Sequence, residues 1–169
     1  MRILILFALC ALLYWSEGHK QEECLKREIR LPMIREMLSM SQDIHKSLPR
    51  DNKPFHRILG KLKKCKELNV PDFKRVLEIY DEHVFEKMWD ELPTQFIDYF
   101  KRLKGIMQNC ATEGKPTQSR CAKEKLKKFE HTLMKLQPDG KTKALSEFHS
   151  VLLWISSGMD RRKTYKKIH

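Results

Sequence analysis

The stretch TKALSEFHSVLLWI, residues 142–155, decides the fold of this chain. Its apolar residues recur every three or four positions along one face of a helix, and they are Ala144, Leu145, Phe148, Val151, Leu152 and Ile155. At about 100° per residue, Leu153 and Trp154 point away from that face. A helix of this kind lies at the centre of a bundle or meets a partner on its outer side, and we expect both.

Prolines divide the rest of the chain into segments with helical periodicity. Proline fits the first turn of a helix but not its interior, so these residues mark helix starts and connections. We expect the other helices at about 32–48, 55–68, 69–89, 93–110 and 119–136. The turn signal at 137–140 and Gly158 should bound the last helix. No convincing strand pattern appears, so the predicted fold class is all-α, a bundle of six helices.

Two local patterns refine this prediction. Asn69 followed by Asp72 is the signature of a helix N-cap with an acidic residue three positions later. Serine at position 119 stands where the fifth helix begins.

The inner face of the first helix is expected to comprise Ile34, Met37, Leu38, Ser41, Ile44, His45 and Leu48.

The amino-terminal residues 1–18 read as a secretory signal peptide. Arg2 precedes an apolar run from Ile3 to Trp15, which is short for a membrane span, and small residues follow at Ser16 and Gly18. We expect cleavage after Gly18 and secretion of the remainder. Residues 19–169 then form a single helical domain with a basic tail at about 159–169.

The cysteines agree with an extracellular location. Cys24, Cys65, Cys110 and Cys121 lie beyond the predicted signal peptide, and an even number in a secreted chain indicates two disulfides. Four cysteines allow three pairings, and spacing alone leaves all three open. The cysteines and histidines do not have the spacing of a zinc-binding motif.

The chain is strongly basic, with 34 Lys and Arg against 22 Asp and Glu and a formal net charge of +12. Such a balance favours acidic partners, namely glycosaminoglycans, nucleic acid or anionic membranes. The basic residues gather in three clusters on the second helix, the fifth helix and the tail. The candidate polyanion-binding residues are Lys123, Lys127, Lys128, Arg161, Arg162, Lys163, Lys166 and Lys167.

No catalytic motif is evident. The chain lacks a phosphate-binding glycine loop, a nucleophile elbow and a His-Glu-x-x-His sequence. His83 and Glu86 share one helical face, but without a third ligand close in sequence we expect a solvated pair. We therefore predict a protein that is not an enzyme and needs no cofactor.

The segment from Lys143 to Ile155 resembles the last-helix signature of the interleukin-10 family of class II helical cytokines. That signature reads Lys-Ala-aliphatic-x-Glu, then an aromatic residue or Leu, then Asp-x-Leu-Leu. This chain matches it at Lys143, Ala144 and Glu147, and it has His149 at the position where an acid is common.

The resemblance implies a six-helix class II cytokine bundle that bridges two different receptor chains and triggers JAK–STAT signalling. One chain would contact the first helix, the connection after it and the last helix, and the other would contact the first, third and fourth helices. The implied receptor pair is the interleukin-20 receptor alpha subunit with the interleukin-10 receptor beta subunit. The resemblance also implies disulfides from Cys24 to Cys110 and from Cys65 to Cys121.

The outward residues of those elements are the candidate receptor-binding residues: Arg35, Glu36, Ser39, Asp43, Lys46, Arg50, Asp51, Lys53, Lys143, Ser146, Glu147 and Ser150. Three other functions stay open: a cationic antimicrobial or nucleic-acid-binding effector, an interleukin-22-like cytokine, and an interferon-gamma-like dimer. A homodimer that exchanges its last two helices through the 111–119 connection is also an open alternative.

Overall fold

The computed structural model describes residues 2–48, 59, 61–65, 68–114, 117–136 and 139–165, without the side chains of 13–19, 63 and 160–165. Its elements are α1 (Arg2–Glu28), α2 (Leu31–Ser47), η1 (Leu62–Lys64), α3 (Val70–Tyr80), η2 (Asp81–Phe85), η3 (Trp89–Glu91), α4 (Thr94–Ala111), α5 (Arg120–Lys135) and α6 (Asp139–Tyr165). All of these are helical and no strand occurs among the described residues, which confirms the all-α prediction.

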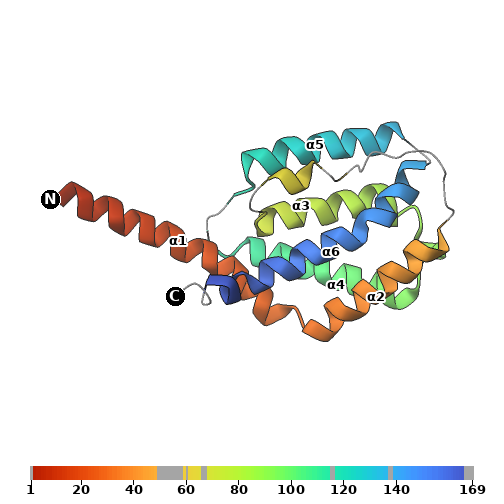
Figure 1. Cartoon of the computed structure of the whole chain (residues 1–169), viewed down its shortest axis with the longest axis horizontal. Coiled ribbons are helices and arrows are strands. Elements are labelled where there is room, and N and C mark those ends of the chain that lie inside the picture. Colours follow the sequence, from red (N-terminus) through yellow and green to blue (C-terminus); the bar gives the residue numbers. More distant parts are fainter. Residues whose placement is uncertain are drawn as a thin grey trace.

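The helices pack around α6. Helix α2 lies along α6, α3 lies along α4, and α5 contacts both α3 and α6. Helix α1 reaches α4 and α6 through its second half, whereas its first half extends away from the bundle (Figure 1). Helices α5 and α2 lie on opposite sides of the bundle, so the surfaces that they expose face in different directions (Figure 1).

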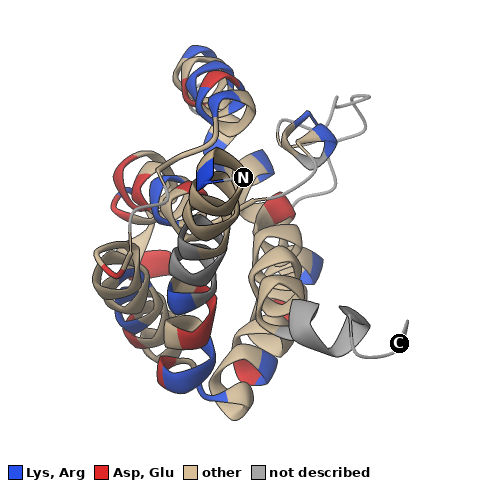
Figure 2. Cartoon of the chain, turned by 90° about the vertical axis from the view of Figure 1, so that its left-hand side faces the viewer, with Lys and Arg blue, Asp and Glu red and all other residues tan. Residues whose placement is uncertain are grey.

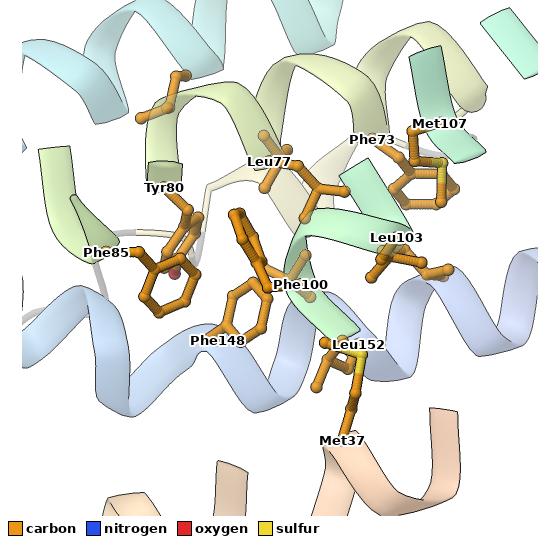
Figure 3. Packing of buried hydrophobic residues seen from close by; sticks show 14 of the residues in the cluster. Met37, Phe73, Leu77, Tyr80, Phe85, Phe100, Leu103, Met107, Phe148 and Leu152 are labelled. Atoms are coloured by element: carbon orange, nitrogen blue, oxygen red, sulfur yellow. The ribbon is translucent and has the colours of Figure 1, made fainter. Parts of the chain in front are cut away.

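The core is aromatic at its centre. Phe148 on α6 meets Tyr80 at 4.9 Å and Phe85 at 5.0 Å between ring centroids, and Phe85 meets Phe100 at 4.5 Å. These rings are tilted or edge to face, an arrangement that stabilises aromatic pairs beyond simple burial. Figure 3 shows these side chains converging from α3, η2, α4 and α6. Truncating a fully buried phenylalanine such as Phe148 costs about 3–5 kcal/mol.

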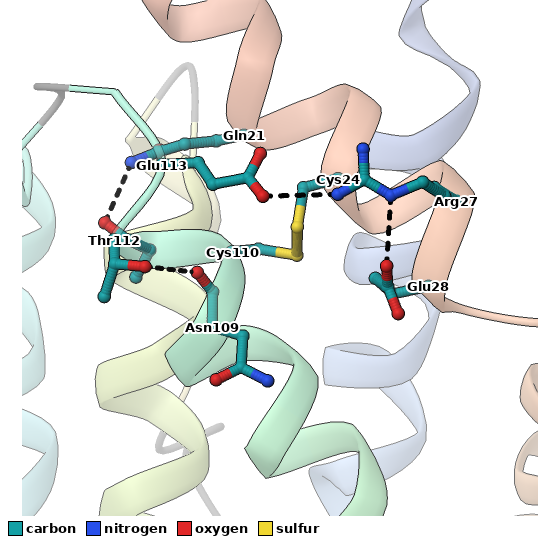
Figure 4. The surroundings of a disulfide bond; sticks show 9 residues. Gln21, Cys24, Arg27, Glu28, Asn109, Cys110, Thr112 and Glu113 are labelled. Carbon is teal, nitrogen blue, oxygen red and sulfur yellow. Dashed lines mark hydrogen bonds and ion pairs between the residues drawn. A yellow bond between two sulfur atoms is a disulfide. The ribbon is translucent and has the colours of Figure 1, made fainter.

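The second half of α1 is part of the bundle, although the sequence predicted its first helix only from Pro32. Cys24 in α1 is bonded to Cys110 in α4, and Gln21 donates a hydrogen bond to the carbonyl of Ala111 at 3.2 Å (Figure 4). Arg27 forms an ion pair with Glu113 beside them.

None of the helices in the described part of the chain has the length and apolar character that crossing a membrane requires.

The second disulfide joins Cys65, just after η1, to Cys121 in the first turn of α5. Both disulfides therefore have the pairing that the family resemblance implies. In the chain-entropy view, closing loops of 86 and 56 residues contributes about 4–5 kcal/mol each. Of the helix predicted at 55–68, the described residues contain only the short turn η1, and most of the rest lies outside them.

Asp72 links the start of α3 to the start of α5. As predicted, Asn69 and Asp72 form a capping box, in which each side chain accepts a hydrogen bond from the other's backbone. The buried Asp72 carboxylate also accepts a hydrogen bond from the amide of Ser119, the N-cap of α5, at 3.1 Å. Burial raises the pKa of the Asp72 carboxyl, although the hydrogen bonds from Asn69 and Ser119 act in the opposite direction.

Helix α6 is longer than predicted at both ends. It begins at Asp139, so Gly140 belongs to its first turn, where the Gly140 amide donates to the carbonyl of Leu136 at 2.7 Å. It also continues past Gly158 to Tyr165. Gly158 does not end the helix; it is buried and lies against the ring of Phe73 on α3.

The two glycines of α6 should respond in opposite ways to alanine. At Gly158 a Cβ would lie 3.4 Å from the Phe73 ring, which is ordinary contact, so Gly158→Ala should stabilise the protein by up to about 1 kcal/mol through helix propensity. At Gly140 a Cβ would lie 3.0 Å from the backbone oxygen of Leu133, which cannot move aside easily. Gly140→Ala should therefore destabilise by about 1–3 kcal/mol in urea unfolding. Equal shifts in both variants would contradict this assignment.

Candidate functional site

Helix α2 exposes a charged arc on the side opposite its apolar face. The five residues predicted to point outward from this helix are not buried: Arg35, Glu36, Ser39, Asp43 and Lys46. Asp43 and Lys46 form a loose ion pair at 3.9 Å with side chains 73% and 77% exposed, so it adds little stability. His45 is exposed as well, which corrects its predicted place on the inner face.

Glu36 is the member of this arc that contacts another helix. Its carboxylate accepts hydrogen bonds from the Tyr99 hydroxyl at 2.5 Å and from the Gln95 amide at 3.2 Å, both on α4. The bond to Glu36 raises the pKa of the Tyr99 hydroxyl above its ordinary value. The exposed edge between α2 and α4 is thus a polar surface whose side chains hold one another in place.

The predicted outward residues of α6 are half-buried rather than open: Lys143, Ser146, Glu147 and Ser150. The Glu147 carboxylate accepts a hydrogen bond from the backbone amide of Leu59 at 3.0 Å. Leu59 is itself buried, so Glu147 anchors the connection that follows α2 against α6. Burial lowers the pKa of the Lys143 ammonium, and the nearby Glu147 carboxylate partly opposes that change.

Further along α6, a weakly polar strip faces solvent. Leu153 is 45% exposed and Ser157 is exposed, and they follow Ser150 at helical spacing, so the three lie on one side of the helix. Trp154 beside them is half-buried and packs against the core. Leu153 is thus an apolar side chain at the surface of a helix whose other large apolar residues are buried or half-buried within the described range.

His149, which stands where the family signature commonly has an acid, lies between α6 and α2. Its Nδ1 is 3.0 Å from the hydroxyl of the buried Ser41, which donates its own proton to the carbonyl of Leu38. The two side chains are therefore within hydrogen-bonding distance of each other between α2 and α6. The histidine takes the role of satisfying a buried hydroxyl between the two helices.

Helix α5 carries the basic surface. Its exposed basic and histidine side chains recur at helical spacing: Arg120, Lys123, Lys127, Lys128, His131 and Lys135. Figure 2 shows Lys and Arg recurring along this helix, which is uppermost in the view, with fewer acidic residues between them. Arg120 and Glu124 form an exposed ion pair at 3.6 Å, whereas Lys123 and Lys127 form no ion pair with another residue of the described ranges.

Several predicted site residues fall outside the described structure. In the connection after α2 these are Arg50, Asp51 and Lys53, and in the tail they are Lys166 and Lys167. The backbone at Arg161, Arg162 and Lys163 belongs to α6, but their side chains are not described. The candidate residues of α2 and α6 thus lie on two helices that pack against each other, and the α5 lysines lie on the side of the bundle opposite α2.

Sequence reasoning missed the long-range polar contacts of this fold, among them three that α3 and η2 make. The fully buried Tyr80 hydroxyl donates to the carbonyl of Ala144 at 2.8 Å, and burial followed by the charge of Glu147 raises the pKa of this hydroxyl well above its ordinary value. His83 is bonded to Glu130 on α5, not to the exposed Glu86. The third is the contact between Asp72 and Ser119. Polar residues inside apolar stripes were the available signal, but their partners lie 47 to 64 positions away.

Comparison of the chain with protein-family models, with curated proteins and with solved structures gives no match in any of the three. The family resemblance therefore remains a prediction that rests on residues 143–155. Two surfaces bear on function: the α2–α6 face, which comprises the charged arc of α2 and the exposed Leu153 of α6, and the basic surface of α5.

Glu147 should behave as an anchor of the connection. Replacing it with alanine leaves the amide of Leu59 without its acceptor, so Glu147→Ala should lower the free energy of unfolding by about 1–3 kcal/mol. The Leu59 amide should also exchange its proton faster, as followed by NMR. Glu147→Gln, which keeps an acceptor oxygen, and Ser150→Ala on the same helix are the controls. Unchanged protection of the Leu59 amide in Glu147→Ala would refute the anchor role.

Proposed function

We propose that this protein is a secreted cytokine that bridges two class II cytokine receptor chains and triggers JAK–STAT signalling in immune and mucosal defence. The observation that carries the proposal is the side of the bundle where α2 packs against α6: α2 exposes its charged arc, and α6 exposes the apolar side chain of Leu153. An apolar side chain within a polar surround is typical of the centre of a protein interface.

The architecture supports this proposal. The fold is an all-helical bundle, and two disulfides indicate an oxidising environment such as the extracellular space. Within the interleukin-10 family, residues 47–52, 59–64 and 77–85 look most like interleukin-26, for which the receptor pair is the interleukin-20 receptor alpha and interleukin-10 receptor beta subunits. Its basic balance is similar too.

The two faces of α2 suggest how two receptor chains are accommodated. The first would contact α2, the connection after it and α6, and there Asp43 and Leu153 are the central candidates. The second would contact α2, α3 and α4, where the bonded set of Glu36, Gln95 and Tyr99 provides a rigid polar surface. A pre-organised surface loses less side-chain entropy when a partner binds.

A reversed charge at Asp43 or a new charge at Leu153 should reduce signalling without disturbing the fold. Asp43→Arg and Leu153→Glu change exposed side chains, so circular dichroism and unfolding should stay close to those of the unchanged protein. Each should lower the potency of STAT phosphorylation at least about fivefold, since central interface residues each contribute more than about 1 kcal/mol. Cells expressing the two receptor chains provide the assay.

Lys123→Glu is the matched control, because it reverses an exposed charge on α5, on the side of the bundle opposite α2. Full potency of both Asp43→Arg and Leu153→Glu would remove the α2–α6 face as the receptor site. Equal loss in the α5 control would point instead to a general effect of charge. Absence of signalling from the unchanged protein with any class II receptor pair would defeat the cytokine proposal itself.

A second candidate function is polyanion binding by a cationic effector, and the basic stripe on α5 favours it. The exposed Lys123, Lys127 and Lys128 are arranged along one side of a helix, where they can follow a phosphate or sulfate backbone. This surface faces away from α2, so receptor and polyanion binding are compatible on one molecule.

Neutralising that stripe should weaken binding to DNA or heparin in a salt-dependent way. The triple variant Lys123→Gln, Lys127→Gln and Lys128→Gln should reduce the slope of log affinity against log salt for DNA by about 0.9 for each phosphate that the variant no longer neutralises. The control removes the same charge elsewhere, through Arg35→Gln, Lys46→Gln and Lys87→Gln. Identical slopes for the two triple variants would show that α5 is not the polyanion surface.

A further inference from the structure

Three potential metal ligands meet where η2 faces α5. Nε2 of His83 lies 3.0 Å from Oε1 of Glu130 and 3.7 Å from Oε2 of Glu82. The three ligand atoms lie within 4.8 Å of one another, and this is the one such group found among the described residues. We propose that Glu82, His83 and Glu130 bind a zinc ion, a site that depends on neither the receptor proposal nor the polyanion proposal.

The distances suit zinc. Zinc binds imidazole nitrogen and carboxylate oxygen at about 2.0–2.2 Å, so two ligands of a tetrahedral site lie about 3.3–3.6 Å apart. The separations of 3.0 Å and 3.7 Å at His83 bracket that range. The side chain of Glu82 is 59% exposed, so its rotation can bring the carboxylate to the ligand spacing of a tetrahedral site. The fourth position is left to water, as in other zinc sites with three protein ligands.

The π-helical turn explains how neighbouring residues can share one ion. In an α-helix, consecutive side chains diverge by about 100° and do not face each other. In η2 the chain makes a wider turn, closed by the bond from the Glu86 amide to the Asp81 carbonyl at 3.0 Å, so successive residues diverge less. Val84 and Phe85 of the same turn are fully buried, which fixes the direction of Glu82 and His83.

Arg75 on α3 orients Glu130, which is the ligand that α5 supplies. It donates to Oε2 of Glu130 at 2.9 Å, which leaves Oε1 directed at His83. Arg75 also contacts Glu78 at 3.4 Å, so its charge is shared between two carboxylates and does not cancel that of Glu130 alone. Hydrogen-bonded support of a ligating carboxylate is typical of metal sites. With neutral His83, the carboxylates of this cluster outnumber the cations Arg75 and Lys74.

The alternative is a metal-free ion-pair network in which a protonated His83 bridges the two carboxylates. The two arrangements differ in the atom between the ligands, which is a proton in one and a metal ion in the other. Zinc also requires neutral imidazole, whose nitrogen suits transition metals better than Ca²⁺ or Mg²⁺. A metal titration therefore separates the two arrangements directly.

The test is a calorimetric titration of zinc chloride into the disulfide-bonded full chain, expressed without a histidine tag. We expect one zinc ion per molecule and a thermal midpoint that rises with zinc concentration, because an ion bound between η2 and α5 stabilises the folded state. Calcium and magnesium chloride should give neither effect. His83→Gln and Glu130→Gln should each weaken zinc binding at least about tenfold.

His131→Asn is the matched control, since it removes an exposed histidine next to Glu130 and should keep the affinity of the unchanged protein. Zinc binding by His83→Gln as tight as in the unchanged protein would overturn the proposal. Should the ligand variants fail to fold, NMR of the unchanged protein decides, because the Nε2 resonance of His83 must shift on saturation with zinc. An unmoved His83 resonance at saturation would likewise overturn it.

Discussion

The burial of α6 beneath the aromatic side chains of α3, η2 and α4 is the interaction on which this bundle depends. Phe148 contacts rings from all three of those elements, and the Tyr80 hydroxyl reaches into the same helix to bond the carbonyl of Ala144. A buried hydroxyl must find an acceptor, so the bond fixes the position of α6 as well as its face. Helices α1, α2 and α5 then pack on the sides of α6 that remain.

Periodicity and capping were sufficient to predict much of this arrangement. The apolar stripes of α3, α4, α5 and α6 identify buried faces because an amphipathic helix in a bundle must turn its apolar side inward. The capping box at Asn69 identified where α3 begins. The same reasoning predicted the exposed arc of α2. It placed His45 on the inner face, although this residue is exposed, because helical spacing alone does not resolve the edge of an apolar stripe.

The contacts that sequence reasoning missed are polar and long-range. Glu147 was predicted to point outward, yet it bonds the amide of Leu59, and no local pattern names a partner 88 positions away. The π turn at η2 was equally hidden, since it differs from an α-helix by one hydrogen-bond register and leaves the apolar pattern almost unchanged. Helix α6 passed through Gly158 because packing on Phe73 outweighed the low helix propensity of glycine.

The two disulfides differ in accessibility. Cys24 and Cys110 are both buried, whereas Cys121 is exposed beside the lysines of α5. A thiolate must reach a sulfur to exchange with it, and positive charge nearby favours the anionic attacker. Reducing conditions should therefore open the Cys65–Cys121 bond first and release the connection after α2 from α5 while α1 stays attached to α4. On reduction, release of the loop should therefore precede unfolding of the bundle.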